Sequence, residues 1–514
     1  MNTDTSPAAQ GSRRYVSNVL WTWGGTATGI IIAFLVTPYM VRKIGYAHFG
    51  IWTLTLSLVE YYWLIDIGLR SATIKFAAEY YAAGKKDELD GLVNTGLTYS
   101  LAAAVVVALA SIFGAPLVGR VVRIDDPVFP QLARIIGISW AVGLVFNIFN
   151  ACIEGFQRFD IIGRIWMCTT VLRTLAVVIV LSLGYGLIQM GLVLLGTQLL
   201  VYALNFLCFR RLAPDAKLNL WLASWKKFRE MAGFGVHALR AIISDKLLRQ
   251  TPPALISRYL PVTAVAFYMM PLRILDYAMD GVGRVGSVTT PNAAGLMATG
   301  KGDQLEDLGV YANRYSFALF LPVVLMLLVY GRDLCRLWIS LDFANQSAYL
   351  IPAFLFGHAI VSSQLNSVSI LFGIGRHQAY SRFLLAEAIL SFIGLIVVLP
   401  RFGLLGAAWL TNILMALNQG VISCALLCHE LDVSFWRYAA RIYTRPLLLA
   451  AAGFVFLLFL KRTALPGNSW RELILATLAL GIPYTAAAFV VCVSAEHQQL
   501  ALRKARQTLA RFGA

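Results

Sequence analysis

Residues 82–100 read AAGKKDELDGLVNTGLTYS, and residues 298–316 read ATGKGDQLEDLGVYANRYS. A constant shift of 216 in residue number relates the two stretches, and eight of their 19 positions are identical. The identical residues of the first stretch are Ala82, Gly84, Lys85, Asp87, Leu89, Leu92, Tyr99 and Ser100. Similarity at a fixed, long separation is typical of a duplicated structural unit. We therefore predict that the chain contains two copies of one unit.

The composition is that of a membrane protein. The chain has 514 residues, of which 59% are hydrophobic and 13% are charged, and its mean hydropathy is +0.70. A soluble chain carries about 25% charged residues, so a soluble protein of this length is excluded. A bilayer core needs about 20 apolar helical residues per crossing, and the chain offers fourteen such stretches. The sequence predicts an all-α polytopic membrane protein with about 14 transmembrane helices.

The repeat organises these helices. The shift of 216 covers six predicted spans, an even number, so both copies have the same orientation and form a parallel repeat. Asn150 then falls on Asn366 and, with a slip of two residues, 155–158 (GFQR) falls on 373–376 (GIGR). The prediction is two six-helix lobes plus two C-terminal helices. The predicted segments are a cytoplasmic N-terminus (1–14), a first lobe (15–210), a cytoplasmic inter-lobe linker (211–231), a second lobe (232–430), spans 13 and 14 (431–494) and a basic cytoplasmic tail (495–514).

The excess of basic residues, 43 against 26 acidic ones, follows the membrane topology. We place 26 bases on the loops of one face, 12 on the other face and five inside spans. Cytoplasmic loops are enriched in Lys and Arg, so both termini are predicted to be cytoplasmic. This charge indicates anionic membrane lipids as partners and no nucleic acid. The seven cysteines form no CxxC motif, and we predict no metal, no cofactor and no catalytic residue.

Five bases lie inside predicted helices, where each costs roughly 3 kcal/mol or more. We predict that they bind an anionic substrate, and ion pairing within a helix, Asp245–Arg249 or Arg273–Asp276, is the alternative. Pro252-Pro253 is predicted to break the seventh helix. The candidate substrate-binding residues are Arg173, Arg240, Lys246, Arg249 and Arg273.

The predicted helices contain as many acidic candidates as basic ones. Buried carboxylates can carry protons or sodium in coupled transport, or they can neutralise the bases. Glu60 and Asp276 occupy equivalent positions in the two copies, at the shift of 216. His358 is expected to be a hydrogen-bond donor between helices. The candidate ion-coupling or ion-pair residues are Glu60, Asp245, Asp276, Asp280 and Glu387.

Several short motifs resemble those of one family. Residues 49–54 (FGIWTL) and 66–69 (DIGL) resemble the second span of the bacterial polysaccharide transporters, the Wzx-like flippases of the MOP superfamily. Residues 155–159 (GFQRF) resemble the loop after span four of that family. Residues 334–339 (LCRLWI) resemble its loop after span nine, although Ser340 stands where the family commonly has Gly. The resemblance covers about residues 15–430.

The resemblance implies a V-shaped, two-lobed fold that alternates access to a central cavity in the bacterial inner membrane. It implies transport of an oligosaccharide on polyprenyl pyrophosphate, with the polysaccharide polymerase machinery as a candidate partner. A MATE-type multidrug or cation antiporter, which shares the fold, is the alternative and predicts an acid-dominated cavity. A membrane O-antigen polymerase or ligase is a further alternative. Such enzymes need a long external loop, and every external loop predicted here is short.

Overall fold

The computed structural model describes residues 7–66, 68–500 and 502–503, with side chains except those of 7–23, 26, 234–239, 241, 284, 285 and 287. All regular elements in these ranges are helices, and no strand occurs among them, so the all-α prediction is confirmed. Ten of the described helices are long and apolar enough to cross a membrane. Large apolar side chains such as Phe113 and Leu448 are exposed, as contact with lipid requires. The chain is a multi-pass membrane protein.

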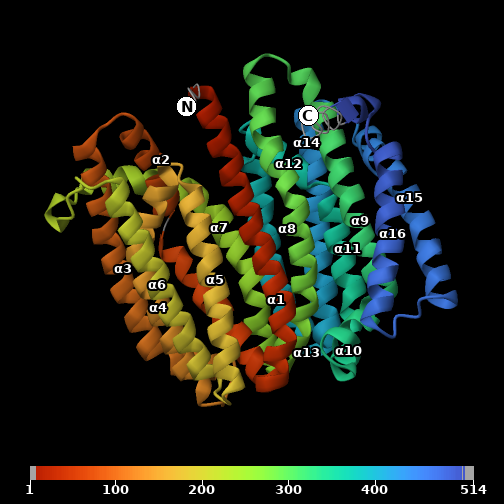
Figure 1. Ribbon diagram of the computed structural model, residues 1–514, viewed down its shortest axis with the longest axis horizontal. Coiled ribbons are helices and arrows are strands. Elements are labelled where there is room, and N and C mark those ends of the chain that lie inside the picture. Colours follow the sequence, from red (N-terminus) through yellow and green to blue (C-terminus); the bar gives the residue numbers. More distant parts are fainter. Residues whose placement is uncertain (1–6, 67, 501, 504–514) are drawn as a thin grey trace, which may run out of the picture. The chain divides into compact units, whose positions relative to one another are not determined.

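Packing divides the chain into two units, Met1–Ala266 and Phe267–Ala514. The elements of the first unit are α1 (Pro7–Val59), η1 (Glu60–Asp66), α2 (Leu69–Ala82), α3 (Lys86–Val121), α4 (Val128–Gly155), α5 (Phe159–Ser182), α6 (Leu187–Leu212), η2 (Leu220–Leu222) and α7 (Trp225–Tyr259). Helix α4 packs against α3 and α6, and α1 packs against α5 and α7. Figure 1 shows α3 to α6 running side by side.

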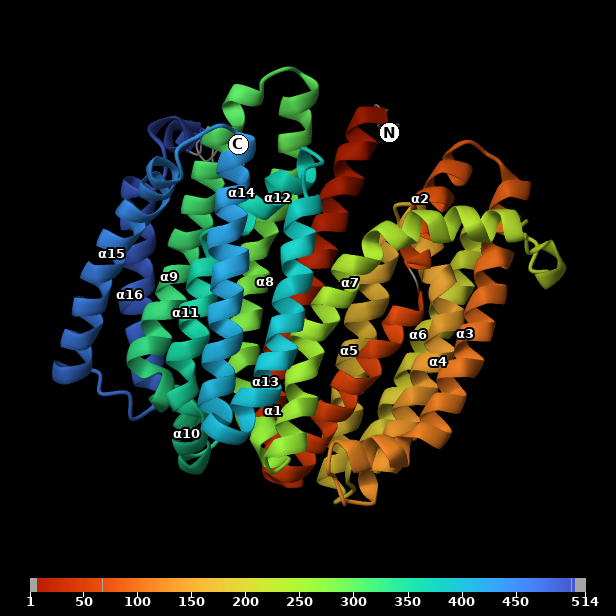
Figure 2. The same ribbon diagram turned by 180° about the vertical axis from the view of Figure 1, so that it is seen from behind.

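The second unit is built around one helix, α9. Its elements are α8 (Thr263–Ala298, which begins in the first unit), η3 (Gly302–Gln304), α9 (Leu305–Trp338), α10 (Leu341–Ser347), η4 (Ala348–Leu350), α11 (Ile351–Ser362), α12 (Leu365–Gly373), α13 (Gln378–Met415), η5 (Ala416–Ile422), α14 (Ser423–Glu430), α15 (Phe435–Thr463) and α16 (Trp470–Val491). Helix α9 contacts α11, α12, α15 and α16, which Figure 2 shows as neighbours.

Two helices are each interrupted by a glycine. α1 has 53 residues, which is about 80 Å of helix and far more than a bilayer core of about 30 Å. Gly45 (φ 77°, ψ 168°) breaks it, and Gly403 (φ 58°) breaks α13 in the same way. Positive φ is accessible to glycine without a steric penalty. α1 with η1 therefore covers two of the predicted spans, and α13 with η5 and α14 covers two more. The count of fourteen stays a prediction.

The predicted shift of 216 relates the turn before α3 to the turn before η3, and the two turns have the same backbone geometry. Lys85 N donates to Tyr80 O at 2.9 Å, and Lys301 N donates to Leu296 O at 2.9 Å. Gly84 has φ +65°, and Gly300, its equivalent in the second copy, has φ +71°. The same backbone bonds close both turns at the predicted shift.

A second pair of sites shows the predicted slip of two residues. A Cβ on Gly155 would overlap Ile74 O, and a Cβ on Gly373 would overlap Thr290 O. The residue numbers of the two carbonyls differ by 216, and those of the two glycines differ by 218. In each copy a helix therefore approaches its neighbour's backbone at a glycine, and only the absence of a side chain allows this distance.

Charged pairs join loops that are predicted to share a membrane face. The pairs at predicted cytoplasmic ends are Lys86–Asp215, Lys227–Glu88, Arg376–Glu430 and Arg441–Glu306, and those at predicted external ends are His48–Asp126 and Lys461–Asp333. No ion pair of this kind, among the described residues, joins loops of opposite predicted faces. The pairs agree with the predicted alternation of spans. The side chains of Arg13 and Arg14, and the tail beyond residue 503, lie outside the described part.

Helix α7 packs with the first unit. It contacts α1, α2, α3 and η1, and Lys227 Nζ lies 2.7 Å from Glu88 Oε2. Ser257 Oγ donates to Val122 O at 2.9 Å at its other end. The packing boundary at residue 266 thus falls one helix later than the predicted start of the second lobe at residue 232. The division into 15–210 and 232–430 describes the repeat and stays a prediction.

Candidate functional site

Seven of the ten predicted site residues lie on α7 and α8. These two helices have 35 and 36 residues, long enough to span a bilayer. Neither is among the ten apolar helices of the described chain, because charged side chains interrupt both. Charged membrane helices face protein or a water-filled cavity rather than lipid. α7 and α8 are therefore the helices whose composition best suits the lining of a path for a polar substrate.

Lys246 of α7 forms an ion pair with Glu60 of η1. Lys246 Nζ lies 2.7 Å from Glu60 Oε2, and the two side chains are 15% and 31% exposed. One turn away Tyr61 Oη and Thr251 Oγ1 are 2.6 Å apart. The predicted base Lys246 is therefore neutralised by a residue from a different helix.

Arg249 is paired within its own helix. Arg249 Nε lies 2.8 Å from Asp245 Oδ1, at i,i+4, and both side chains are exposed. The structure thus forms the pair that the sequence offered as the alternative to substrate binding. The predicted break at Pro252-Pro253 is wrong, since α7 continues to Tyr259. The backbone of a helix tolerates proline when packing supports it, and both prolines are buried.

On α8 the predicted Arg273–Asp276 ion pair is not formed. Among the described side chains Arg273 has no carboxylate within 4.0 Å, and its side chain is exposed. Asp276 Oδ1 instead lies 3.8 Å from His358 Nε2 on α11. The other ring nitrogen of His358 lies 2.8 Å from Phe354 O of its own helix, and 3.8 Å is too long for a hydrogen bond, so the predicted hydrogen bond from His358 to another helix stays a prediction. Asp280 is exposed.

Arg173 and Arg240 also lack a carboxylate within 4.0 Å among the described side chains. Arg173 is half-buried in α5, the fifteenth of 24 residues, and so lies about 21 Å from the start of that helix. Arg240 is exposed on α7. Of the five predicted bases, two are paired and three have no carboxylate partner among the described side chains.

Glu387 of α13 is the most buried of the predicted acids, at 4% exposure. It accepts hydrogen bonds from Asn418 Nδ2 at 2.6 Å and from Gln419 Nε2 at 3.1 Å. Both donors lie on η5, a π-helical turn, and π-helical turns are frequent at functional sites. Gln419 also lines a pocket of about 370 Å³ together with Thr290 and Ser369. The carboxylate is thus one side chain away from a cavity.

A polar cluster around Arg70 of α2 was not predicted from the sequence. The Arg70 guanidinium donates to Asn147 Oδ1 at 2.8 Å, to Asn150 Oδ1 at 3.0 Å and to Glu154 Oε2 at 2.5 Å. Its backbone N–H also donates to Asp66 Oδ2 at 3.2 Å. The signal was present, because the three side-chain acceptors are spaced i, i+3 and i+7 and so share one face of an apolar span.

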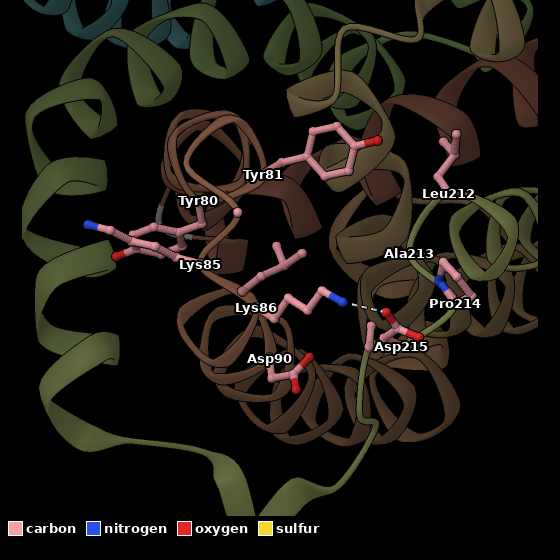
Figure 3. A pocket seen from close by; sticks show the side chains of 12 residues that line it. Tyr80, Tyr81, Lys85, Lys86, Asp90, Leu212, Ala213, Pro214 and Asp215 are labelled. Atoms are coloured by element: carbon pink, nitrogen blue, oxygen red, sulfur yellow. Dashed lines mark hydrogen bonds and ion pairs between the residues drawn. The ribbon is translucent and has the colours of Figure 1, made fainter.

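A second unpredicted feature is a pocket of about 160 Å³ where the α2–α3 and α6–η2 loops meet. Figure 3 shows Lys86 reaching across to Asp215, and their Nζ–Oδ2 distance is 2.6 Å. The hydrogen bond from Lys86 holds the pKa of Asp215 below its usual range. Asp90 Oδ1 accepts from Lys217 N at 3.1 Å. The charges of Lys86 and Asp215 in this pocket therefore neutralise each other.

Comparisons with known proteins agree with this architecture. Residues 39–346 match the model of a family described as "Polysaccharide biosynthesis protein". The chain is 24% identical over 504 residues to the uncharacterized membrane protein EpsK of Bacillus subtilis, covering 93% of this chain and 95% of EpsK. It is 19% identical over 404 residues to a proposed O-antigen transporter of Shigella flexneri, covering 76% of this chain and 93% of that protein.

Two solved structures share the fold. The inward closed conformation of the lipid II flippase MurJ is similar with a TM-score of 0.69 and 13% identity, over 92% of this chain and 98% of MurJ. The inward-facing conformation of a multidrug resistance MATE family transporter of the MOP superfamily is similar with a TM-score of 0.64 and 14% identity, over 82% of this chain and 97% of that transporter. At these identities the similarity concerns the fold alone.

Proposed function

The chain belongs to the family of polysaccharide biosynthesis proteins matched by residues 39–346, and from this premise we propose that it is a membrane transporter. Its substrate is an oligosaccharide carried on polyprenyl pyrophosphate. The Shigella flexneri relative is named for O-antigen transport and MurJ for lipid II flipping, and both names fit a lipid-linked sugar. Transport proceeds by alternating access in the bacterial inner membrane, with both termini in the cytoplasm, and supplies the polysaccharide polymerase machinery.

The observation that carries this proposal is the set of unpaired bases in the helices. Arg173, Arg240 and Arg273 have no carboxylate within 4.0 Å among the described side chains. An unpaired cation in a membrane helix is costly and marks a substrate or ion pathway. A pyrophosphate group carries two or more negative charges, and guanidinium groups bind phosphate oxygens in pairs. The three arginines are the proposed contacts of the pyrophosphate.

The paired residues have a different role in this mechanism. The Lys246–Glu60 ion pair joins α7 to η1, and the Arg249–Asp245 ion pair lies within α7. In this proposal these charges stabilise the protein and do not bind the substrate. Glu387, buried and close to a cavity, is the proposed carrier of a coupling proton or sodium ion, with Asp276 and Asp280 as further acids. The buried Glu387 also favours the second candidate function, a MATE-type cation antiporter.

The proposal is tested in proteoliposomes with a fluorescent polyprenyl-pyrophosphate oligosaccharide and a membrane-impermeant quencher. Arg173→Gln, Arg240→Gln and Arg273→Gln should each slow translocation by roughly tenfold or more, since each removes charge-assisted hydrogen bonds. Arg249→Gln is the matched control, because its charge is already neutralised on an exposed helix face, and it should keep the wild-type rate.

Two results would contradict this function. Wild-type rates in all three arginine variants would exclude the proposed pyrophosphate contacts. Export of an organic cation that depends on Glu387, with no movement of the lipid-linked sugar, would establish the antiporter instead.

A further inference from the structure

Three arginines gather at one end of the second unit, away from the residues considered above. Arg314 lies on α9, and Arg441 and Arg445 lie one turn apart on α15. Together with Thr444 and Ser494 they line a pocket of about 450 Å³. None of the described residues that line this pocket is acidic.

Arg314 is the key member because it is buried and lacks a counter-ion. It is 6% exposed, and it donates from Nε to Arg441 O at 2.8 Å and from Nη1 to Cys492 O at 3.5 Å. No carboxylate lies within 4.0 Å of it among the described residues. A buried guanidinium that has only carbonyl partners keeps its full charge, and this is costly unless an anion accompanies it.

The neighbouring arginines differ in how they are satisfied. Arg441 lies 2.5 Å from both Glu306 and Asp307, so its charge is compensated from outside the pocket. Arg445 donates from Nη1 to Val491 O at 3.2 Å, and no carboxylate lies within 4.0 Å of it in the described part of the chain. Two guanidinium groups, one buried and one at the exposed rim, are therefore available to the pocket.

The chemistry of the pocket fits a phosphate group. Arginine binds phosphate oxygens through two parallel N–H groups, and the hydroxyl of Ser494 can donate to a further oxygen, whereas the hydroxyl of Thr444 donates to Ala440 O at 2.7 Å. Tyr311 also lines the pocket, and the Arg314 guanidinium lies over its ring, 5.7 Å from the ring centroid. The volume exceeds that of a phosphate ion and leaves room for a substituent such as glycerol.

The residues that flank the pocket are typical of the level of the lipid headgroups. Trp436, at the start of α15, is 79% exposed, and tryptophan is enriched at the level of the headgroups. Arg441 and Arg445 follow it by less than three turns, before the apolar part of the helix. We propose that this pocket is a phosphate-binding site, filled by an anionic phospholipid headgroup or by a soluble phosphate compound. This site is independent of the proposed transport path.

The test uses the purified full-length protein and two probes, phosphatidylglycerol and inorganic pyrophosphate. Bound lipid is counted by native mass spectrometry, and pyrophosphate binding is measured by calorimetry. Arg445→Gln should weaken binding of the probe by roughly tenfold, and Ser494→Ala should weaken it less. Arg437→Gln, which removes the same charge from an exposed position of α15 outside the pocket, should bind as the wild type does.

The outcomes separate the two sources. Retention of phosphatidylglycerol that Arg445→Gln abolishes identifies a lipid headgroup site. Binding of pyrophosphate without lipid identifies a site for a soluble phosphate compound. Binding of neither probe, or equal loss in Arg445→Gln and Arg437→Gln, overturns the proposal. Because removal of the buried Arg314 can prevent folding, the exposed Arg445 is the decisive position.

Discussion

Lys246 Nζ lies 2.7 Å from Glu60 Oε2, and this pair joins α7 to η1 through two residues that are 186 positions apart in the chain. Glu60 is the first residue of η1, the 3₁₀ turn that follows α1, and Lys246 lies in the middle of α7. The pair is mostly removed from solvent, so each charge depends on the other. It fixes α7 against the end of α1.

Removing one partner of this pair should destabilise the protein. Lys246→Met leaves the Glu60 carboxylate without a cation, which we expect to lower the free energy of unfolding by about 2 kcal/mol. Thermal unfolding of the purified protein in detergent measures this change. Arg249→Gln, in an exposed pair, should cost less than about 1 kcal/mol. The exchange Lys246→Glu with Glu60→Lys should recover part of the loss, and failure of Lys246→Met to lower the melting temperature would contradict the role of the pair.

Loss of Arg70 from its polar cluster should lower the free energy of unfolding more than loss of Lys246 does. Arg70→Gln removes three side-chain hydrogen bonds and leaves Glu154 without its counter-ion, which we expect to cost about 3 kcal/mol. Arg376→Gln is the control, because its pair with Glu430 is exposed and 3.5 Å long. Its expected cost is below about 1 kcal/mol. Equal melting temperatures for the two variants would show that the cluster contributes nothing beyond a surface pair.

Whether these features could be predicted depends on the sequence distance between partners. Apolar runs predicted the helices, and the i,i+4 spacing predicted Asp245–Arg249, because both signals are local. The internal repeat predicted that the turns at Gly84 and Gly300 are equivalent. The Lys246–Glu60 pair has no local signal, since it depends on how α7 packs.

The phosphate pocket could not be predicted for the same reason. Arg314 meets the backbone of Arg441, 127 residues away, and that of Cys492, 178 residues away. From the sequence, Arg314 is predicted to be one of the basic residues of a cytoplasmic loop. Only the packing of α9 against α15 and α16 shows that it is buried and has no carboxylate within 4.0 Å in the described part of the chain.

The hydrogen bonds from Asn418 and Gln419 to the Glu387 carboxylate should contribute to the stability of the protein. In Glu387→Gln the amide oxygen can take the place of Oε2, which accepts from both Asn418 and Gln419. The new NH₂ group then faces the Gln419 Nε2 that donated to Oε1, at a cost of about 1–2 kcal/mol. Thermal unfolding measures the loss. Asp280→Asn, at an exposed position of α8, should leave the melting temperature unchanged. An unchanged melting temperature in Glu387→Gln would mean that the carboxylate is not held by these amides.

The two glycines of the repeat should respond in the same way to one added methyl group. Gly155→Ala places a Cβ against Ile74 O, and Gly373→Ala places one against Thr290 O. In both cases the obstacle is backbone, which cannot rotate away, so each substitution should force the helices apart at a cost of about 1–3 kcal/mol. Thermal unfolding of the two variants should show similar losses because the two contacts are equivalent. Gly114→Ala is the control, since nothing lies within 4 Å of the position that its methyl group would take on α3, and alanine there should be neutral or stabilise the helix by up to about 1 kcal/mol. Tolerance of alanine at one glycine and not at the other would show that the equivalence of the copies does not extend to this contact.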